Sequence, residues 1–317
     1  MAHALVTGAT GFVGPHLVAH LTECGDTVIG SDPADPSRRG PDLLDFDGWR
    51  GLVADAAPDV IYHLAGWSNV GASWANPRQV WRVNTEGTLA VLEAADGAGV
   101  ARVVIVSSAD VYGPLDPASM PILDEQPTNP ASPYGASKAA AEVLALQFDR
   151  SHDLDVVIAR PFNHIGPGQS PGFVVAAFAQ RIAEAELAGG GEVRHGDLSA
   201  RRDFTDVRDT VRAYRLLAER GTPGRTYNIC TGHDVAMSEV LEQLRSLASV
   251  EIDTAIDESL LRPIDVPVHR GSARRLHDDT GWTPTIPLDQ TLADVLEDAR
   301  LRVAAAHPTA TDPQEQT

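Results

Sequence analysis

A tyrosine and a lysine four residues apart carry the strongest chemical signal in the chain. Tyr134 and Lys138 stand in the segment YGASK, and residues at this spacing share one face of a helix. An ammonium group beside a phenol stabilises the phenolate and lowers its pKa, so the tyrosine can act as an acid or base near neutral pH. Ser108 ends an upstream predicted strand, and its hydroxyl could hydrogen-bond the same substrate oxygen. We predict catalytic roles for these three residues, against the alternative of an ordinary pair on a helix surface.

A glycine-rich turn, TGATGFVG, lies between the first predicted strand and the first predicted helix. Glycines there permit a tight turn and close approach of the backbone to a pyrophosphate, whose charge the helix N-terminus stabilises. Asp32 ends the next predicted strand, where a carboxylate can accept hydrogen bonds from an adenosine ribose. We therefore predict a dinucleotide site rather than a plain strand–helix turn, with these residues in contact: Gly8, Thr10, Gly11, Phe12, Val13 and Gly14.

The charges around this turn bear on which cofactor it takes. Asp32 would repel a 2′-phosphate, which favours NAD(H) over NADP(H), although Arg38 and Arg39 close by weaken that preference. Asp42 and Leu43 could contact the adenine, with a surface loop as an equal alternative for the aspartate. NAD(H) or NADP(H) is thus the predicted cofactor, and NAD(H) is slightly favoured.

Short apolar runs rich in β-branched residues alternate with helical patterns in the first half of the chain. Each run is apolar on both faces, as expected of parallel strands covered by helices on both sides. The predicted strands are Ala4–Thr7, Thr27–Ser31, Val60–Leu64, Val103–Ser108 and Val156–Arg160. Helical stripes fall between them, over 12–21, 80–92 and 139–148. The alternation predicts the α/β class and a Rossmann-type doubly wound parallel sheet.

After Arg160 this alternation stops. The segment 161–172 is rich in Gly and Pro, and helices are predicted over 173–187, 238–248 and 289–304, with a late strand at Tyr227–Cys230. We expect a dinucleotide-binding domain over 1–162 with a return segment near 203–232. A second, smaller and mainly C-terminal substrate domain is expected over 163–202 and 233–305, followed by a disordered tail over 306–317.

The composition excludes several classes of partner. Lys plus Arg number 25 and Asp plus Glu number 44, a net charge of −19, which argues against nucleic acid or an anionic membrane. A small phosphate-bearing ligand is still compatible, because local arginines and helix N-termini can hold one. Two distant cysteines, Cys24 and Cys230, make neither a disulfide framework nor a zinc site, and no metal is expected. With no signal peptide or membrane-length apolar run, we expect a cytoplasmic protein.

Beyond these signals, the sequence resembles the extended short-chain dehydrogenases/reductases that act on nucleotide sugars. The resemblance covers nearly the whole chain. Five blocks are typical of the superfamily: TGATGFVG, YHLAG (62–66), VNTEGT (83–88), SSADVYG (107–113) and YGASK. Three blocks, RPFNHIGPGQ (160–169), RDFTDVRD (202–209) and RPIDVP (262–267), are similar to the GDP-mannose branch. That branch contains GDP-mannose 4,6-dehydratases and GDP-6-deoxy-4-keto-mannose reductases.

The resemblance implies further ligand contacts. On the cofactor side it adds Leu64, Ala65, Gly66, Asn84, Ser107 and Pro161 to Tyr134 and Lys138, with Lys138 also holding the nicotinamide ribose. On the substrate side it implies Ser108, Asn163, Val174, Arg202 and Arg262. Arginine suits this role because its guanidinium binds phosphate oxygens bidentately. For Arg202, an ion pair with Asp203 or Asp206 is the alternative.

Two positions after Ser108 bear on which reaction is catalysed. By resemblance, dehydratases place two groups there, typically Asp-Glu or Ser-Glu, which help to remove the C5 proton and the C6 hydroxyl. Here those positions hold Ala109, which has no proton to exchange, and Asp110, one methylene shorter than glutamate. Asp110 could still act as a base, or serve only as a turn or capping carboxylate. We therefore predict a reductase of the C4 ketone of a GDP-4-keto-6-deoxy sugar, forming GDP-rhamnose or its C4 epimer.

Other readings of the sequence stay open. A GDP-mannose 4,6-dehydratase or a nucleotide-sugar 4-epimerase is the alternative within the same superfamily. A non-catalytic dinucleotide sensor is the alternative from another class, although such a protein needs only the glycine turn and Asp32. The resemblance also implies a homodimer that pairs the helices around 84–97 and 134–150. A GDP-linked nucleotide sugar is the predicted small-molecule partner.

Overall fold

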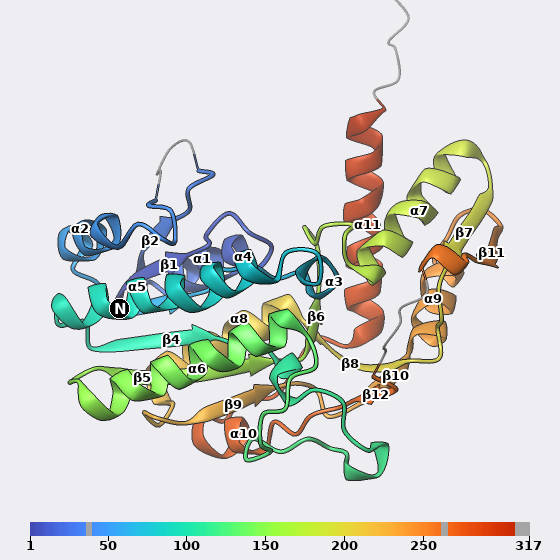
Figure 1. Cartoon of the computed structure of the whole chain (residues 1–317). Coiled ribbons are helices and arrows are strands. Elements are labelled where there is room, and N and C mark those ends of the chain that lie inside the picture. Colours follow the sequence, from blue (N-terminus) through green and yellow to red (C-terminus); the bar gives the residue numbers. More distant parts are fainter. Residues whose placement is uncertain (36–39, 261–265, 308–317) are drawn as a thin grey trace, which may run out of the picture. The chain divides into compact units, whose positions relative to one another are not determined.

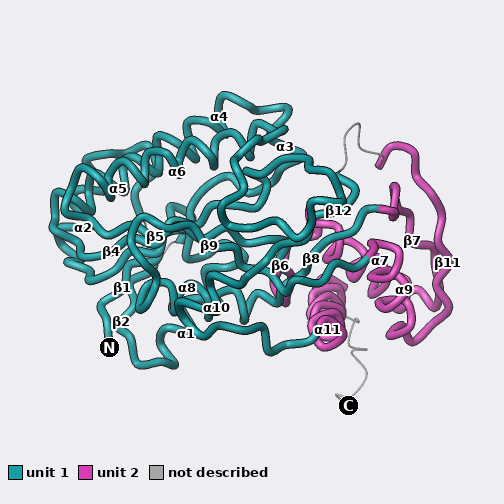
Figure 2. Tube along the Cα trace, turned by 90° about the horizontal axis from the view of Figure 1, so that it is seen from below, with its two compact units in different colours: residues 1–164, 200–235, 266–287 teal, residues 165–199, 236–265, 288–317 magenta. Residues whose placement is uncertain are grey.

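The computed structural model describes residues 1–35, 40–260 and 266–307. The chain divides into two compact units, each built from three separate segments (Figure 2). Unit 1 comprises residues 1–164, 200–235 and 266–287, and unit 2 comprises residues 165–199, 236–265 and 288–317. Arg38, Arg39 and Arg262 lie outside the described residues, as does the predicted tail from position 308 onward.

A six-stranded parallel sheet forms the centre of unit 1 within the described residues. Its strands are β1 (His3–Thr7), β2 (Thr27–Ser31), β3 (Val60–His63), β4 (Arg102–Val106), β5 (Asp155–Pro161) and β9 (Thr226–Ile229). They lie in the order β2-β1-β3-β4-β5-β9, so the topological switch point falls between β1 and β3. The predicted fold class is confirmed, and the predicted late strand at 227–230 is β9 at the sheet edge.

Two apolar cores cover the two faces of this sheet. Successive residues of a strand point to opposite faces, so Leu5 belongs to one core whereas Ala4 and Val6 belong to the other. Figure 1 shows α5 and α6 on one face and α8 on the other. The core with Leu5 takes side chains from α2 (Phe46–Ala56), α5 (Gly87–Gly97) and α6 (Pro133–Ser151). The opposite core takes them from α1 (Val13–Glu23), α8 (Val207–Arg220) and α10 (Arg274–Thr280).

The helical stripe predicted over 80–92 is not one α-helix. After α3 (Val70–Ser73), α4 (Pro77–Trp81) runs through η1 (Arg82–Glu86), a π-helical turn, into α5. This turn buries Asn84 and Thr85, and the Thr85 hydroxyl donates to the Ser137 carbonyl, 3.3 Å away. Single π turns of this kind are frequent at functional sites. The apolar spacing could not reveal it, because one extra residue in the turn leaves most apolar positions on the buried face.

A small second sheet in unit 1 centres on β8 (Arg201–Asp206). It is bordered by β10 (Asp234–Ala236) and β12 (Val268–His269), and β6 (Asn163–Ile165) also pairs with β8. In the parallel β12–β8 pair, His269 lies opposite Arg202. The Asp203 carboxylate accepts from the backbone N–H groups of Thr231 (2.8 Å) and Gly232 (2.9 Å), which ties β8 to the loop after β9.

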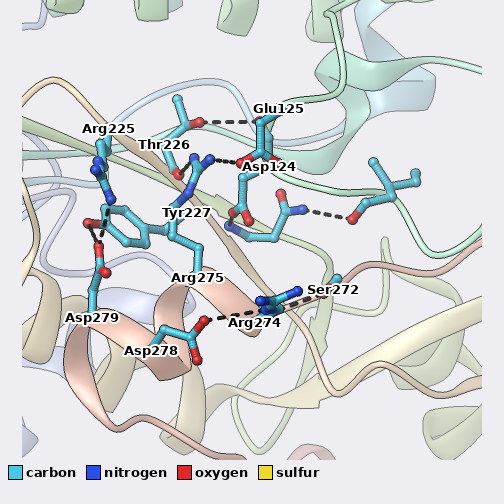
Figure 3. Close-up of polar contacts among 12 residues, drawn as sticks. Asp124, Glu125, Arg225, Thr226, Tyr227, Ser272, Arg274, Arg275, Asp278 and Asp279 are labelled. Carbon is cyan, nitrogen blue, oxygen red and sulfur yellow. Dashed lines mark hydrogen bonds and ion pairs between the residues drawn. The ribbon is translucent and has the colours of Figure 1, made fainter.

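Polar contacts fasten α10 to the edge strand β9 (Figure 3). Arg275 donates to the Thr226 carbonyl at 2.8 Å and also pairs with Glu125. The Tyr227 hydroxyl donates to Asp279 at 2.6 Å, and Arg225 pairs with the same carboxylate at 3.4 Å. These contacts hold the segment 266–287 on unit 1 although it follows β9 by some forty residues of chain. Short 3₁₀ turns, η2 (Ala109–Tyr112) and η3 (Pro117–Ser119), complete the unit.

Unit 2 consists mainly of helices. Its elements are α7 (Val174–Ala188), β7 (Gly191–His195), α9 (Met237–Ser246), β11 (Ile252–Ile256), η4 (Glu258–Leu260) and α11 (Leu288–Ala306). β7 and β11 pair in parallel as a two-stranded sheet. Arg300 of α11 donates two hydrogen bonds, of 2.8 and 2.7 Å, to the Glu186 carboxylate of α7. The three helices predicted for this half of the chain are confirmed, with ends shifted by at most two residues.

Two kinds of feature are absent from the described residues. Among them, no helix combines the length and apolar composition needed to cross a membrane. In those same residues, no group of three or more His, Cys, Asp or Glu side chains is arranged to hold a metal ion. Cys24 is exposed, Cys230 is buried, and both are free thiols.

Gly14 and Gly51 offer a matched test of how closely α1 packs on the glycine turn. A Cβ on Gly14 would lie 2.5 Å from the carbonyl carbon of Ala9, whereas a Cβ on Gly51, inside α2, would have no heavy atom within 4 Å. We expect Gly14→Ala to lower the free energy of unfolding by about 1–3 kcal/mol. Gly51→Ala should raise it by about 0.5–1 kcal/mol, because alanine restricts the unfolded chain. Urea unfolding checks both, and equal effects would contradict the close packing.

Candidate active site

The glycine turn joins the end of β1 to the start of α1 at the carboxyl edge of the sheet. The Gly8 N–H donates to the Ser31 carbonyl at 2.9 Å, and the Gly11 N–H donates to the Gly8 carbonyl at 3.1 Å. Gly8 has a φ of +69°, and a Cβ there would lie 2.9 Å from the Ala65 nitrogen, so only glycine fits. Helix α1 begins at Val13 without a side-chain cap from Phe12, which leaves first-turn N–H groups for an anion.

Asp32 stands at the rim of this turn. Its carboxylate accepts from the Ala34 N–H at 2.9 Å and, at a longer 3.4 Å, from the Thr10 N–H. The side chain that was predicted to face the adenosine ribose is therefore held beside the predicted phosphate-binding backbone. Asp42 accepts from the Leu44 N–H at 2.9 Å, and Leu43 packs against the core at Gly87. Their predicted contact with adenine stays a prediction.

The structure brings Ser108, Asp110 and Tyr134 together at the end of β4. All three belong to unit 1, and the Ser108 and Tyr134 side chains are buried. The Ser108 hydroxyl donates to Asp110 Oδ2 and accepts from the Asp110 backbone N–H, both at 3.1 Å. The Tyr134 phenol lies close enough to Ser108 and Asp110 for both to affect its pKa. The three polar groups thus lie together, and Ser108 rather than Asp110 caps the 3₁₀ turn η2.

Helix α6 holds Tyr134 and Lys138 on its buried face. Ser132 caps the helix by accepting from the Gly135 N–H at 3.0 Å, and Pro133 occupies the first turn, where it costs no hydrogen bond. The Lys138 ammonium donates to the Val106 carbonyl at the end of β4, 2.9 Å away. The spacing prediction of a shared helix face is therefore right.

The predicted effect of Lys138 on Tyr134 is wrong for this structure. Burial, and secondarily the Asp110 carboxylate, raise the pKa of Tyr134 above its usual value, and the hydrogen bond with Ser108 opposes them only in part. Burial also lowers the pKa of Lys138, to about 8, against the attraction of Glu142. The sequence showed the pairing of the two groups but not their desolvation, which is the larger effect here.

Asn84 and Gly66 stand on the other side of Lys138. The Asn84 side chain accepts from the Trp67 N–H at 2.7 Å and donates to the Ser137 hydroxyl at 2.9 Å. A Cβ on Gly66 would lie 2.7 Å from Asn84 Oδ1 and 3.6 Å from Lys138 Nζ. Asn84 thus anchors the backbone that follows β3, beside Lys138. Leu64 and Ala65 precede Gly66, and the Ala65 N–H donates to the Thr7 hydroxyl at 3.0 Å.

His63 links β1, β3 and η1–α5 beneath the glycine turn, and sequence reasoning gave it no role. The Thr88 hydroxyl donates to the Asn84 carbonyl at 2.6 Å, so it accepts from His63 Nε2 at 3.2 Å. His63 Nδ1 then accepts from the Thr7 hydroxyl at 2.9 Å. The chain of bonds needs a neutral imidazole, and burial, reinforced by Lys138, lowers the pKa of His63 to about 3.

His269 is a second residue that the sequence did not single out. Its ring is buried on β12, its centre lies 4.9 Å from that of the Phe162 ring, and the Ala109 backbone is close enough to affect its pKa. It therefore lies beside the segment between Ser108 and Asp110. Burial, with the neighbouring Arg202, lowers the pKa of His269 to about 4, so it is neutral at physiological pH. Only a pairing between distant segments could have revealed it.

The predicted substrate residues are dispersed over both units. Asn163 is exposed on β6, and Arg202 on β8 donates to the carbonyls of Arg201 (2.9 Å) and Val266 (2.6 Å). Asp203 and Asp206, the alternative partners of Arg202, accept from Thr231 and pair with Arg208, respectively. Val174 begins α7 in unit 2, and Arg262 lies outside the described residues.

The residues present fit a nicotinamide dinucleotide. The glycine turn exposes uncapped N–H groups, and Asp32 stands beside them. The buried Ser107 and Ser31 hydroxyls have no hydrogen-bond partner among the described residues, as expected of groups that pair with a ligand. Pro161 ends β5 on the same sheet edge.

Residues 4–230 match the NAD dependent epimerase/dehydratase family, and the chain belongs to this family. The family resemblance found in the sequence is therefore confirmed. The chain is 39% identical over 300 residues to the GDP-6-deoxy-D-mannose reductase of Pseudomonas aeruginosa, covering 94% of this chain and 97% of that protein. It is 34% identical to a UDP-glucose 4-epimerase of Mycolicibacterium smegmatis, covering 92% and 97%. The structure of RMD from Pseudomonas aeruginosa complexed with NADPH has a TM-score of 0.85 at 37% identity, covering 94% and 99%.

Acidification tests the neutral state of His63. The folded protein lowers its pKa to about 3, whereas the unfolded chain binds a proton below about 6.5, so His63 costs stability as the pH falls through 6.5. His63→Gln should be less stable at neutral pH but should lose less on acidification. The difference in free energy of unfolding between wild type and His63→Gln should narrow by about 1.4 kcal/mol per pH unit below 6.5. Urea unfolding at about pH 7 and about pH 5.5 measures the gap; a constant gap would contradict the assignment.

Proposed function

We propose that the chain is an NAD(P)H-dependent reductase of the C4 ketone of a GDP-4-keto-6-deoxy sugar. The observation that carries this is the set Tyr134, Ser108 and Asp110 beside Lys138, on the same sheet edge as the glycine turn. The similarity to a GDP-6-deoxy-D-mannose reductase over nearly the whole chain supports the same reaction. In this proposal unit 1 holds the cofactor.

Tyr134 is the proton donor in the proposed reaction. Reduced nicotinamide, when bound, supplies the hydride to the sugar carbon. The carbonyl oxygen then gains negative charge and needs a proton, which a neutral phenol can give. The raised pKa of Tyr134 suits this direction, because the phenol stays protonated at neutral pH. Ser108 shares the substrate oxygen, and Lys138 holds the nicotinamide ribose.

The two residues after Ser108 favour a reductase over a dehydratase. Elimination of water across C5 and C6 needs one group to take a proton and another to give one. Ala109 offers neither, and the backbone around it lies beside His269. Asp110 is the one carboxylate near Ser108 in this segment, and it is already engaged by the Ser108 hydroxyl. A dehydratase would need Asp110 to do the work of two groups.

The substrate side of the proposal rests on charge. A nucleoside diphosphate sugar is an anion, and a chain of net charge −19 needs local cations to bind it. Arg202 and Arg262 are the proposed phosphate or ribose contacts, with Asn163 and Val174 nearby in the family pattern.

The product is GDP-rhamnose, or GDP-6-deoxy-talose if the opposite face of the sugar meets the hydride. As part of the same proposal the enzyme is a homodimer, as in related proteins, and it is cytoplasmic, because a reducing compartment keeps exposed thiols such as Cys24 unpaired.

Substrate consumption tests the proposed reaction. The purified chain, given NADH or NADPH and a GDP-4-keto-6-deoxy sugar, should lower the absorbance of the reduced cofactor, whereas UDP- or dTDP-linked 4-keto sugars should react more slowly. Tyr134→Phe should bind cofactor but lose about 10²–10⁴-fold in turnover, because the proton donor is gone. GDP-mannose turned over to a 4-keto product without net cofactor change would instead identify a dehydratase. Full activity of Tyr134→Phe would overturn the role of the phenol.

Asp32 tests the cofactor preference. Its carboxylate beside Thr10 should repel a 2′-phosphate, so wild type should bind NADH more tightly than NADPH. Asp32→Ala should move the ratio of the two dissociation constants toward NADPH by about tenfold or more. Asp55→Asn, an exposed change on α2, is the matched control and should leave the ratio unchanged. Titration of intrinsic fluorescence measures both constants; an unchanged ratio in Asp32→Ala would show that the carboxylate does not select the cofactor.

A further inference from the structure

A buried arginine–carboxylate pair lies behind the proposed catalytic groups. Arg160 is on β5 and Glu142 is on α6, and both side chains are more than nine-tenths buried. Arg160 Nε donates to Glu142 Oε1 at 2.8 Å and Nη2 donates to Oε2 at 2.6 Å, which is the two-pronged geometry that makes such pairs strong. Neither residue was assigned a role from the sequence.

The third nitrogen of the same guanidinium reaches a different segment. Arg160 Nη1 donates to the Tyr112 hydroxyl at 3.0 Å and to the Asp124 carbonyl at 3.3 Å, and the guanidinium carbon lies 4.8 Å from the centre of the Tyr112 ring. The Tyr112 hydroxyl donates onward to Asn228 Oδ1 at 2.6 Å. Asp124 in turn accepts from the Asn228 N–H at 2.6 Å, next to the cluster of Figure 3.

These contacts connect the two segments that carry the proposed chemistry. Glu142 follows Lys138 by one helical turn and Tyr134 by two. Contacts that fix Glu142 therefore also fix the part of the helix that carries both residues. Tyr112 ends the 3₁₀ turn that Ser108 caps. A single planar group therefore fixes helix α6 and the Ser108 turn relative to β5. Lysine could not do this, because it lacks the rigid fork.

We propose that Arg160 and Glu142 act as a charge-balanced clamp, which positions Ser108 and Tyr134 relative to one another and sets the net charge that Lys138 experiences. Both are positioning residues, since they act through the catalytic groups. The inference rests on the proposed function for the roles of those groups. It goes beyond that function in assigning the reaction's geometry and charge to a pair outside the site.

The charge part of the proposal follows from the burial of both partners. A lone carboxylate one turn away would strengthen proton binding by Lys138, and a lone guanidinium would weaken it. Besides Lys138 and the pair itself, the buried titratable groups on α6 or around it are Tyr134, His63, Tyr112 and Asp124, and Asp110 is half-buried. The more exposed ones are Arg78, Arg82, Glu86, Glu93, Asp96, Arg102, Asp149, Arg150 and Asp155, whose effects are screened by solvent. Loss of one clamp partner therefore changes the nearby buried charge by one unit.

Two variants separate charge from geometry. Glu142→Gln keeps the shape and an acceptor but removes the negative charge, so it should move the alkaline limit of turnover to lower pH by about one to two units. Arg160→Lys keeps the charge but loses the fork. It should leave that limit in place and lower kcat by about ten- to a hundredfold with little change in KM. Asp47→Asn, at an exposed pair with Arg50 on α2, is the control and should match wild type.

A binding measurement keeps the test independent of turnover. The pH at which NADH or NADPH affinity declines, followed by protein fluorescence, should shift in Glu142→Gln and not in Arg160→Lys. If wild type turns over none of the GDP-, UDP- or dTDP-linked sugars named above but this binding shift is seen, the clamp stands and the proposed reaction falls. If Glu142→Gln does not fold, the charge-neutral double variant Glu142→Gln/Arg160→Gln replaces it and should restore the wild-type pH limit. Equal pH limits in wild type and Glu142→Gln, or equal shifts in both single variants, would overturn the proposal.

Discussion

Parallel strands all end at one edge of their sheet, and the assembly of the site depends on that constraint. β1 delivers the glycine turn to this edge, β4 delivers Ser107 and Ser108, and β5 delivers Pro161. Residues up to about 150 positions apart in sequence thus reach the same edge of the sheet. The helices then add Tyr134 and Lys138 from one face, because α6 packs on the sheet through Ala145 and Phe148 farther along. The packing of the core in this fold therefore also sets the positions of the proposed catalytic side chains.

Desolvation governs the electrostatics of these groups more than pairwise attraction does. Burial alone accounts for the largest part of the shifts at Tyr134, Lys138, His63 and His269. The protein meets that cost with hydrogen bonds that specify one protonation state for each group, as in the bonds from Thr7 through His63 to Thr88. The neutral His63 imidazole lies near Lys138, and burial lowers the pKa of that lysine. Such an interior changes little in charge at physiological pH, except at the lysine.

The order of elements and the site motifs could be predicted from the sequence, because both depend on patterns among residues close together in the chain. A strand, a glycine turn and a helix read as one unit, and Tyr134 and Lys138 fall on one face from their spacing alone. What the sequence could not reveal depends on distant segments or on burial. The π-helical turn at Asn84 leaves the apolar pattern nearly intact, His269 meets Ala109 only through β12, and the direction of the pKa shift at Tyr134 reflects how fully it is covered. The roles assigned to the site residues remain predictions.

Unit 2 is assembled from three stretches of chain, and the last of them includes α11, which holds α7 through Arg300 and Glu186. A ribosome making this protein releases α7 long before its partner helix exists. The unit can therefore complete its packing only after α11 has been synthesised, and until then the apolar side of α7, including Phe178 and Ile182, lacks its final packing partner. Translation past residue 300, rather than the appearance of any single element, sets the moment at which this part of the molecule can become native.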